Sequence, residues 1–406
     1  MTEVIEKTEY KKGYKKTKLG WIPEDWKMVC FNELFDEVVN LSNDTETYPL
    51  YSLTLENGVT PKTERYERSH LLKDKNENEF KLISEGEIAI NPMNLRFGAF
   101  FMSKVPETVS LSAYYDIVKA KKDTVNVIFY DAFMKSASAR RLYQRIATGS
   151  LDEKKRIHLS ELKKQLVPYP KKEEQDKIAE ILSTWDDGIE TLEKLIEQKE
   201  ILKNILAQKC FRRKNILFSL KQHKLGELFK NRKETNCRDL ELLSVCEGLG
   251  IVPRSQLKAK DNSNEDKSKY LKVCIGDLAY NTMRMWQGRC GVSSYEGIVS
   301  PAYTVCIPKN NIDVDYMYYL FKTPHMIHDF WRYSQGIVDD TLNLKFNNFE
   351  VIKIWIPDKE TQTKIAKLLK SYDEEIQLLN FKLEKLKEQK KGLMQKLLTG
   401  QIRVKI

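Results

Sequence analysis

The sequence is poor in the residues that build disulfide frameworks and metal sites. Its seven cysteines are odd in number and never spaced as CxxC, which favours neither a disulfide framework nor a zinc site. Of its five histidines, only His325 and His328 are spaced to share one face of a helix. A surface or packing role fits that pair better than metal binding does. We therefore expect no metal site in this chain.

Long apolar runs and nucleotide-binding loops are also missing. No run approaches the roughly 20 apolar residues that span a bilayer, and the opening MTEVIEKTEYKKGYKK contains no signal-peptide core. A GxxxxGK[ST] loop is absent, so ATP hydrolysis by this chain is not supported. We expect a cytoplasmic protein that does not bind a membrane.

Positive charge is in excess. The 406 residues include 68 Lys and Arg against 58 Asp and Glu, a formal net charge of +10. Charged residues make up 31% and apolar residues 41%, which describes a globular protein with additional surface charge. This length accommodates two or three domains. The excess of cations favours a polyanionic partner, and nucleic acid is the leading candidate.

One stretch occurs twice, as EEQDKIAEIL from Glu173 and as ETQTKIAKLL from Glu360. The two copies place Gln175 on Gln362, and a proline stands just upstream of each. Apolar residues then recur at alternating spacings of four and three, the pattern of a coiled-coil seam. We predict that two long helices pair antiparallel through these positions: Ile178, Leu182, Trp185, Ile189, Leu192, Lys199, Leu202 and Leu206 in the first, and Ile365, Leu369, Tyr372, Ile376, Leu379, Leu383, Leu386, Lys390, Leu393 and Leu397 in the second.

The first copy departs from the second after Leu192. Its next seam members are Leu195, Lys199 and Leu202, four residues earlier than the second copy places them. We therefore predict a local phase change, equivalent to a stammer, that places Lys199 on Lys390. A charged residue in the seam is either a register device or a side chain that leans out to water along its aliphatic stem.

The stretches between the helices are repeated as well. The runs EGEIAINPMNLRFG and SLSAYYDIVKA return as IGDLAYNTMRMWQG and VSPAYTVCIP, in the same order and rich in β-forming residues and turns. We predict an α+β fold in which two similar domains of mixed β-structure with short helices are separated and joined by the long helices around a pseudo-twofold axis. The expected segments are a flexible N-terminal segment 1–17, a first domain 18–172, a first helix 173–212, a second domain 213–358, a second helix 359–401 and a tail 402–406.

At this point the chain resembles a known family. The sequence resembles the specificity subunit of type I restriction-modification enzymes in several motifs: LGWIPEDW, NTMRMWQG followed by IVSPAYTV, and the helical ends EEQDKIAEIL and LEKLKEQKKGLMQKLLTG. The likeness covers essentially the whole length, although the first domain has NPMNLRFG and SLSAYY where the second has NTMRMWQG and SPAYT.

This resemblance implies that each domain is a target recognition domain reading one half of a gapped, asymmetric sequence in double-stranded DNA. The helices would act as a ruler and as a docking surface for two modification subunits. Those subunits would carry adenine methylation with S-adenosylmethionine, and a restriction and translocase subunit driven by ATP and Mg²⁺ would join them. This chain itself would hold no cofactor.

Candidate DNA contacts lie in the repeated turn and in one charge run. Arg can pair with guanine, and Asn or Gln can pair with adenine, in the major groove. Solvation of the same side chains is the alternative, because many contacts with DNA position the protein rather than specify a base. The candidates are Asn91, Asn94 and Arg96 in the first domain, Asn281, Arg284, Gln287 and Arg289 in the second, and Lys154, Lys155 and Arg156 on a loop suited to phosphate.

Enzymatic readings are weaker. NPMN resembles the Asn-Pro-Pro-aromatic loop of amino-group methyltransferases, but the repeat aligns it with NTMR, which lacks the prolines of that loop. EGLG resembles a cofactor-binding glycine loop, but the repeat aligns it with ENGV, which has no GxG. Both motifs are more simply turns between strands. Asp25-Trp26-Lys27 has a nuclease-like spacing that a chain rich in Asp and Lys contains by chance. We therefore predict a subunit without an active site. The alternative of another class is a coiled-coil adaptor that binds proteins and has no DNA specificity.

Overall fold

The computed structural model describes residues 12–62, 79–150, 155–212, 218–246, 250–257, 266–338 and 341–406. The chain divides into two compact units. Unit 1 comprises Met1–Thr191 together with Leu383–Ile406, and unit 2 comprises Leu192–Lys382. Each unit therefore contains one globular domain and part of both long helices. Among the described residues, no helix is long and apolar enough to cross a membrane.

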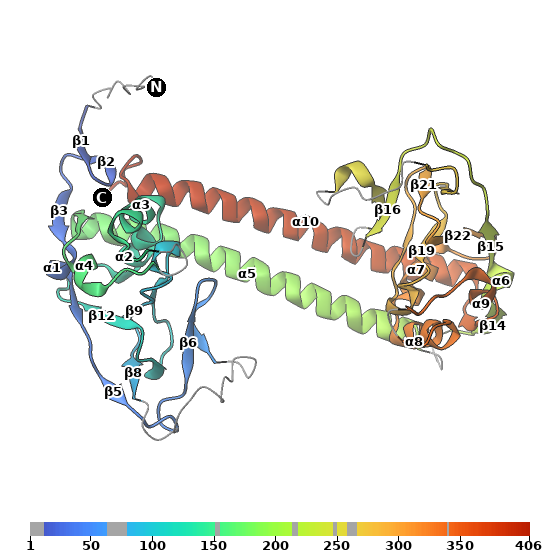
Figure 1. Ribbon diagram of the computed structural model, residues 1–406, viewed down its shortest axis with the longest axis horizontal. Helices are drawn as coiled ribbons and strands as arrows, with labels where there is room; N and C mark the ends of the chain where they lie inside the picture. Colours follow the sequence, from blue (N-terminus) through green and yellow to red (C-terminus); the bar gives the residue numbers. More distant parts are fainter. Residues whose placement is uncertain are drawn as a thin grey trace. The chain divides into compact units, whose positions relative to one another are not determined.

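Unit 1 contains a four-stranded antiparallel sheet in the order β10-β9-β12-β4 and a three-stranded sheet in the order β11-β8-β5. Figure 1 labels β9 and β12 of the first sheet and β8 and β5 of the second. Strand pairs β1-β2, β6-β7 and β13-β3 complete its β-structure. The strands are β1 Tyr14–Thr17, β2 Gly20–Pro23, β3 Lys27–Cys30, β4 Phe35–Glu37, β5 Leu41–Ser42, β6 Tyr51–Thr54, β7 Gly58–Pro61, β8 Phe80–Ile83, β9 Ile88–Ile90, β10 Phe100–Met102, β11 Val109–Ser112, β12 Asp116–Ala120 and β13 Leu166–Tyr169. The short helices are α1 Phe31–Leu34, η3 Leu95–Phe97, α2 Val127–Met134, α3 Ala137–Ile146 and α4 Leu159–Lys163.

Unit 2 repeats this plan. Its four-stranded antiparallel sheet has the order β15-β22-β19-β20, and β16-β17, β18-β21 and β14-β23 form pairs. The strands are β14 Lys221–Lys224, β15 Phe229–Arg232, β16 Leu243–Cys246, β17 Gly250–Pro253, β18 Leu271–Val273, β19 Leu278–Asn281, β20 Cys290–Val292, β21 Gly297–Val299, β22 Tyr303–Pro308 and β23 Lys353–Ile356. The short helices are α6 Leu225–Leu228, η5 Arg254–Gln256, η6 Met285–Gln287, α7 Val314–Phe321, α8 Pro324–Tyr333 and α9 Phe346–Phe349.

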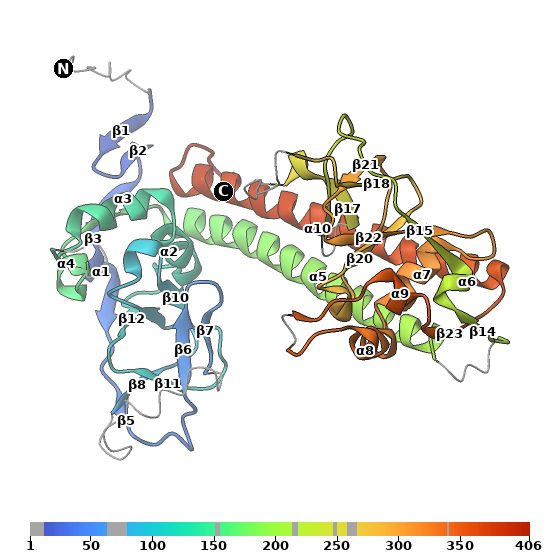
Figure 2. The same ribbon diagram turned by 45° about the vertical axis from the view of Figure 1, so that its right-hand side comes forward.

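Two long helices provide parts of both units: α5 Lys172–Cys210 and α10 Lys359–Leu398. These bounds lie close to the predicted ranges 173–212 and 359–401. In unit 1, Ile178 and Leu397 belong to one hydrophobic core, and Lys390 forms an ion pair with Asp186. Moving from Ile178 to Asp186 along α5, the contacted residue of α10 changes from Leu397 back to Lys390. The helices therefore run antiparallel, side by side as Figure 2 shows. The predicted α+β fold with two domains and two long helices is confirmed.

Unit 2 shows the same antiparallel pairing. Lys199 donates to Glu375 at 2.8 Å, and Lys203, one turn further along α5, forms an ion pair with Asp373. Asp373 and Lys203 occupy the positions in unit 2 that Asp186 and Lys390 occupy in unit 1. Asp373 lies 187 residues after Asp186 and Lys390 lies 187 residues after Lys203, the same offset that relates Gln175 to Gln362. The sequence match of Lys199 with Lys390 is therefore wrong, and the true counterpart of Lys390 is Lys203.

The predicted phase change in α5 is also wrong. Leu195 and Leu202 are 39% and 43% exposed, whereas Ile196 is buried and Lys203 is half-buried. The seam therefore continues after Leu192 through Ile196, Lys199, Lys203 and Leu206 without losing the spacing of four and three. The apolar pattern misled because the stem of Lys203 can lie in the seam while its ammonium group reaches a carboxylate. The remaining predicted seam positions are all buried or half-buried: Ile178, Leu182, Trp185 and Ile189 in α5, and Ile365, Leu369, Tyr372, Ile376, Leu379, Leu383, Leu386, Lys390, Leu393 and Leu397 in α10.

A repeated glutamine fastens each long helix to its domain. In unit 1, buried Gln175 accepts a hydrogen bond from the backbone N–H of Asn126 at 2.9 Å and donates to the carbonyl of Pro170 at 2.9 Å. In unit 2, buried Gln362 accepts from the N–H of Asp313 at 3.0 Å and donates to Pro357 at 2.8 Å. Asn126 and Asp313 are the N-caps of α2 and α7. One side chain therefore joins a domain helix to the start of each long helix.

Both ends of the described chain are ordered within unit 1. For residues 14–17 this differs from the predicted flexible segment 1–17. Tyr14–Thr17 pairs with β2, and the Tyr14 hydroxyl donates to the carbonyl of Gly400 at 2.8 Å. In the tail, the Arg403 guanidinium donates to buried Glu174 at 2.7 Å and to Asp25 at 2.8 Å. Residues 1–11 lie outside the described chain. Local sequence did not indicate these bonds because each joins residues that are far apart in the chain.

Candidate nucleic-acid interface

The repeated turn of the first domain follows β9. The side-chain oxygen of Asn91 accepts hydrogen bonds from the N–H groups of Met93 at 3.1 Å and Asn94 at 3.4 Å. Leu95 is buried beneath the turn, and Gly98, with a φ of 98°, returns the chain to β10. A positive φ of this kind favours glycine. Asn91 is itself buried and shapes the turn, which favours a structural role over the predicted base contact.

The second domain builds the same turn after β19. Asn281 accepts from the N–H of Met283 at 3.0 Å, Met285 is buried, and Gly288 has a φ of 74°. Asn281 therefore shapes this turn as Asn91 shapes the first. The indole N–H of Trp286 donates to the carbonyl of Met283 at 3.0 Å. Among the predicted contacts, Gln287 and Arg289 are exposed and Arg284 is half-buried.

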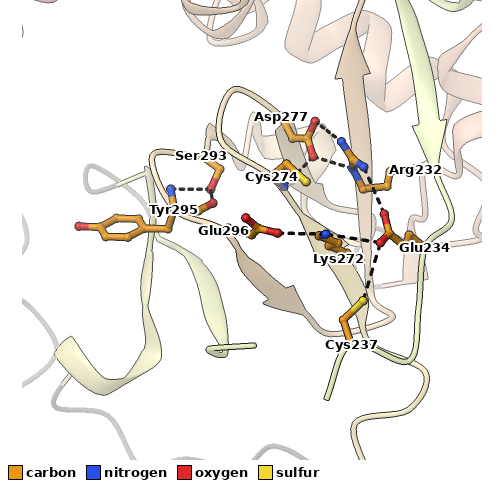
Figure 3. Close-up of polar contacts among 9 residues, drawn as sticks. All are labelled: Arg232, Glu234, Cys237, Lys272, Cys274, Asp277, Ser293, Tyr295 and Glu296. Atoms are coloured by element: carbon orange, nitrogen blue, oxygen red, sulfur yellow. Dashed lines mark hydrogen bonds and ion pairs between the residues drawn. The ribbon is translucent and has the colours of Figure 1, made fainter. Parts of the chain in front are cut away.

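A charged network anchors the start of β19. Figure 3 shows Arg232 of β15 directed at Asp277, to which it donates hydrogen bonds of 2.7 and 3.1 Å. Asp277 is buried and also accepts from the N–H of Cys274 at 2.8 Å. The bond to Asp277 raises the pKa of Arg232 above its ordinary value.

Lys272 lies beside this pair, 3.4 Å from Glu234 and 3.0 Å from Glu296 (Figure 3). The cations of the network are thus matched by carboxylates, which suits a structural role better than phosphate binding. β19 is held by this network at its start and by the Asn281 turn at its end.

A cationic cavity of about 560 Å³ lies beside the first-domain turn. Arg96 and Lys155, both predicted, line it together with Arg140 of α3, and all three charged residues of the lining are cations. The Arg96 guanidinium lies over the Phe97 ring, 4.5 Å from its centroid. Asn94 is half-buried next to Arg96. This lining is suited to a phosphate or to the acceptor edge of a base.

Sequence reasoning missed Arg140 and Gln144, which complete the lining with Phe97 and Ala147. The signal that could have found them is their spacing of four residues on an amphipathic helix, which places both on one face. Nothing in the local sequence connects that face to the turn.

The predicted run of three cations does not form one patch. Lys154 lies outside the described residues. Arg156 lines a different cavity from Lys155, of about 370 Å³, which also contains Asp116, Glu37 and His158. Burial raises the pKa of Asp116 above its ordinary value, against the opposing effect of Lys81. Neighbouring residues of an extended segment project to opposite sides, which accounts for the separation of Lys155 from Arg156.

The second domain presents different chemistry at the equivalent place. Residues Gln335 and Asn343 close a loop through two backbone hydrogen bonds, of 3.0 and 2.8 Å, as Thr148 and Arg156 do in the first domain. Leu344 then bonds to the carbonyl of Thr282 in the turn at 2.8 Å. Ile337 is 99% exposed at this loop, and Trp331 of α8 is also exposed. The first domain offers cations here, and the second offers apolar and aromatic groups.

The motifs that suggested enzymes have structural explanations. Asn91-Pro92-Met93-Asn94 is the capped turn described above. Asp25 is bound by Arg403, which holds the pKa of that carboxyl below its ordinary value, and the Trp26 indole donates to Glu174 at 2.9 Å. In the described part of the chain, no group of three or more His, Cys, Asp or Glu side chains is arranged to hold a metal ion.

Comparison with known proteins gives consistent matches. Residues 23–201 and 253–388 match the family model for the type I restriction modification DNA specificity domain. The type I restriction enzyme MjaVIII specificity subunit of Methanocaldococcus jannaschii is 24% identical over 425 residues, covering 95% of this chain and 94% of that protein.

Two solved structures share the fold. The type I restriction-modification system S subunit from M. genitalium has a TM-score of 0.57 at 16% identity and covers 92% of this chain and 96% of its own. A second structure, which describes complex assembly and conformational transition of the type I R-M system, has a TM-score of 0.53 at 12% identity and covers 94% of this chain and 99% of its own.

Proposed function

Because this chain belongs to the type I restriction-modification DNA specificity family, we propose that it reads a bipartite, gapped DNA target, with one domain for each half-site. Specificity subunits of this family are non-catalytic, and this chain is the DNA sequence-specificity subunit of such a system. Cleavage and methylation belong to other subunits of the complex.

The observation that carries the proposal is the repeated turn. Both turns have the same Asn cap, the same buried anchor and the same left-handed glycine, but they differ in the side chains they expose. The first presents half-buried Arg96 and exposed Phe97, and the second presents exposed Gln287 and Arg289. A shared scaffold with different exposed groups is what two half-sites of different sequence require.

The two domains are proposed to bind by different balances of forces. In the first, Arg96, Arg140 and Lys155 neutralise phosphates or donate to guanine, which makes binding sensitive to salt. In the second, two cations, Arg284 and Arg289, act with the Gln287 amide beside the apolar loop at Ile337, against three cations in the first domain. The first half-site therefore depends more strongly on ionic strength than the second.

We further propose the composition of the complex. The two units repeat the same junction of domain and helix, so they offer equivalent places for two modification subunits, which methylate adenine with S-adenosylmethionine. Restriction and translocase subunits that use ATP and Mg²⁺ complete the assembly, and the complex acts in the cytoplasm. The paired helices set the distance between half-sites.

The test is single-molecule sequencing of DNA from a methylation-free host that expresses this chain with its modification subunit. We expect a two-part motif with a fixed gap and methyladenine in each half. Expression and association of both proteins without any methylated motif would contradict the proposal and favour the adaptor alternative.

A further inference from the structure

The most exposed large apolar side chain in the described part of the chain is Ile337, on the loop between α8 and α9. It is 99% exposed, and Val338 beside it is 58% exposed. Isolated apolar residues at a surface are ordinary, so exposure alone does not mark a binding site. Ile337 is distinguished by the way the loop holds it and by the place where that loop is attached.

The loop holds Ile337 on a hydrogen-bonded backbone. The Thr341 hydroxyl accepts hydrogen bonds from the N–H groups of Ile337 and Val338, both at 3.2 Å, and donates to the carbonyl of Val338 at 2.8 Å. The backbone before Ile337 is closely packed, because a Cβ added at Gly336 would lie 2.7 Å from the backbone of Thr341. These contacts do not involve the Ile337 side chain. The loop therefore presents this side chain to solvent without needing it for its own structure.

The loop is attached to the repeated turn. The N–H of Leu344 donates to the carbonyl of Thr282 in the turn at 2.8 Å. In unit 1, the N–H of Ile157 donates to the carbonyl of Pro92 at 2.9 Å, which is the same junction. A ligand that contacts the turn of unit 2 therefore also meets this loop. Duplex DNA, which the turn is proposed to read, is the occupant that this attachment supports.

The two junctions differ in chemistry. Arg140 and Gln144 of α3 line the cationic cavity of unit 1, and the residues 187 positions later, on α8, are Ile327 and Trp331. Trp331 is 48% exposed. The sequence 333–344 contains two aspartates and no Lys or Arg, so this loop does not neutralise phosphates. Its apolar side chains are suited instead to the stacked bases.

We propose that Ile337 is a wedge that inserts between two base pairs of the half-site read by unit 2 and bends the duplex there. This rests on the proposed function, which assigns one half-site to each domain. Proteins that bend DNA insert Ile, Leu, Phe or Met side chains between base steps, and the wider contact with the bent duplex offsets the cost of unstacking. A β-branched side chain on a bonded loop has little conformational freedom to lose on insertion.

The wedge adds a source of specificity that needs no hydrogen bond to a base. Steps that unstack easily, such as TA and CA, cost less to open than other steps. The half-site of unit 2 should therefore favour such a step at the position that Ile337 enters. The half-site of unit 1 has no such requirement from this loop, because Ser150 stands at the position of Ile337.

The inference is tested with a duplex that carries the two-part motif recovered by methylation sequencing. 2-Aminopurine, whose fluorescence rises when it is unstacked, is placed at successive positions of each half-site except the methylated adenines. The full-length chain in complex with its modification subunit binds this duplex without S-adenosylmethionine. We expect one step in one half-site to brighten. Ile337→Ala should remove that signal and weaken binding about tenfold, whereas Ile337→Leu should retain the signal.

Two comparisons make the test specific. Because the contact is apolar, Ile337→Ala should leave the slope of log K against log[salt] unchanged. The matched control is Ile275→Ala, which removes the same side chain, 73% exposed, from the turn between β18 and β19 at the other end of β19. It should change neither affinity nor fluorescence.

The remaining outcomes separate the wedge from the specificity function. Unchanged affinity and fluorescence in Ile337→Ala would overturn the inference and leave the specificity function intact. Weaker binding with unchanged fluorescence would make Ile337 a surface contact and would also overturn it. The same holds if Ile337→Ala loses the modification subunit in the absence of DNA, since the loop would then contact protein. Failure of the unmodified complex to bind the motif would instead overturn the proposed function.

Discussion

Arg403→Ala is expected to destabilise unit 1 by about 2–3 kcal/mol, because it leaves the buried Glu174 carboxylate without a cation. Arg403 donates to Glu174 at 2.7 and 3.0 Å, and Glu174 lies in the first turn of α5. Removing one partner from a buried ion pair typically costs about 3–5 kcal/mol. The value here is lower because the Arg403 side chain is 41% exposed and because the Trp26 indole continues to donate to Glu174.

Two comparison variants separate the buried contact from the exposed one. Asp25 also binds Arg403, but its side chain is 52% exposed, so Asp25→Asn should cost below about 1 kcal/mol. Glu174→Gln in the Arg403→Ala background removes the unpaired charge and should recover part of the loss.

The measurement is hydrogen–deuterium exchange of full-length variants in graded urea, with peptides of unit 2 as the internal reference. Opening of peptides from 12–30 and 172–185 should shift, and those from 359–372 should not. Equal losses for Arg403→Ala and Asp25→Asn, or a further loss on adding Glu174→Gln, would refute the reasoning.

Three more outcomes are expected. Gln175→Ala should lower the free energy of unfolding by about 2–4 kcal/mol in urea titrations, because the carbonyl of Pro170 and the N–H of Asn126 then lose their hydrogen-bond partner. An effect no larger than that of Gln198→Ala, a change at an exposed glutamine, would contradict this. Lys390→Asp should destabilise the helix pair and Asp186→Lys should restore it, with a coupling of about 0.5–1 kcal/mol in a double-mutant thermal cycle; purely additive effects would count against the ion pair. Arg140→Ala should weaken DNA binding and reduce the slope of log K against log[salt] by about 1 in fluorescence anisotropy, whereas Lys177→Ala on α5, the control, should not; an unchanged slope would exclude phosphate contact.

The long helices and the repeat could be predicted from the sequence because both are periodic. A heptad seam recurs within a few residues, and similar runs in the same order reveal a duplicated domain without knowledge of its strands. Strand order could not be predicted: β9 pairs with both β10 and β12, and β4 joins at the edge, through contacts between residues far apart in the chain.

The candidate site was predicted only in part, for two physical reasons. The amide side chains of Asn91 and Asn281 suit both a base edge and a capped turn, and residue type alone does not distinguish these roles. The cationic cavity joins the turn at Arg96 to α3 at Arg140 and to the segment at Lys155. Only the tertiary fold brings these three segments together.

The continuous seam of α5 changes what an insertion should do. With the phase change predicted from the sequence, four residues added after Leu192 would restore the heptad. In the continuous seam, the same insertion interrupts an intact heptad and should unwind the helix pair locally. One heptad added to both helices, after Leu192 in α5 and after Lys382 in α10, keeps the seam and the antiparallel register, and lengthens each helix by about 10 Å at 1.5 Å per residue. If paired helices set the spacing of the half-sites, methylation sequencing should then find a gap longer by about three base pairs at 3.4 Å per base. The same heptad in α5 alone shifts Lys199 past Glu375 and should destabilise the pair instead. An unchanged gap in the variant with both insertions would show that helix length does not set the spacing of the half-sites, because the seam itself would be preserved.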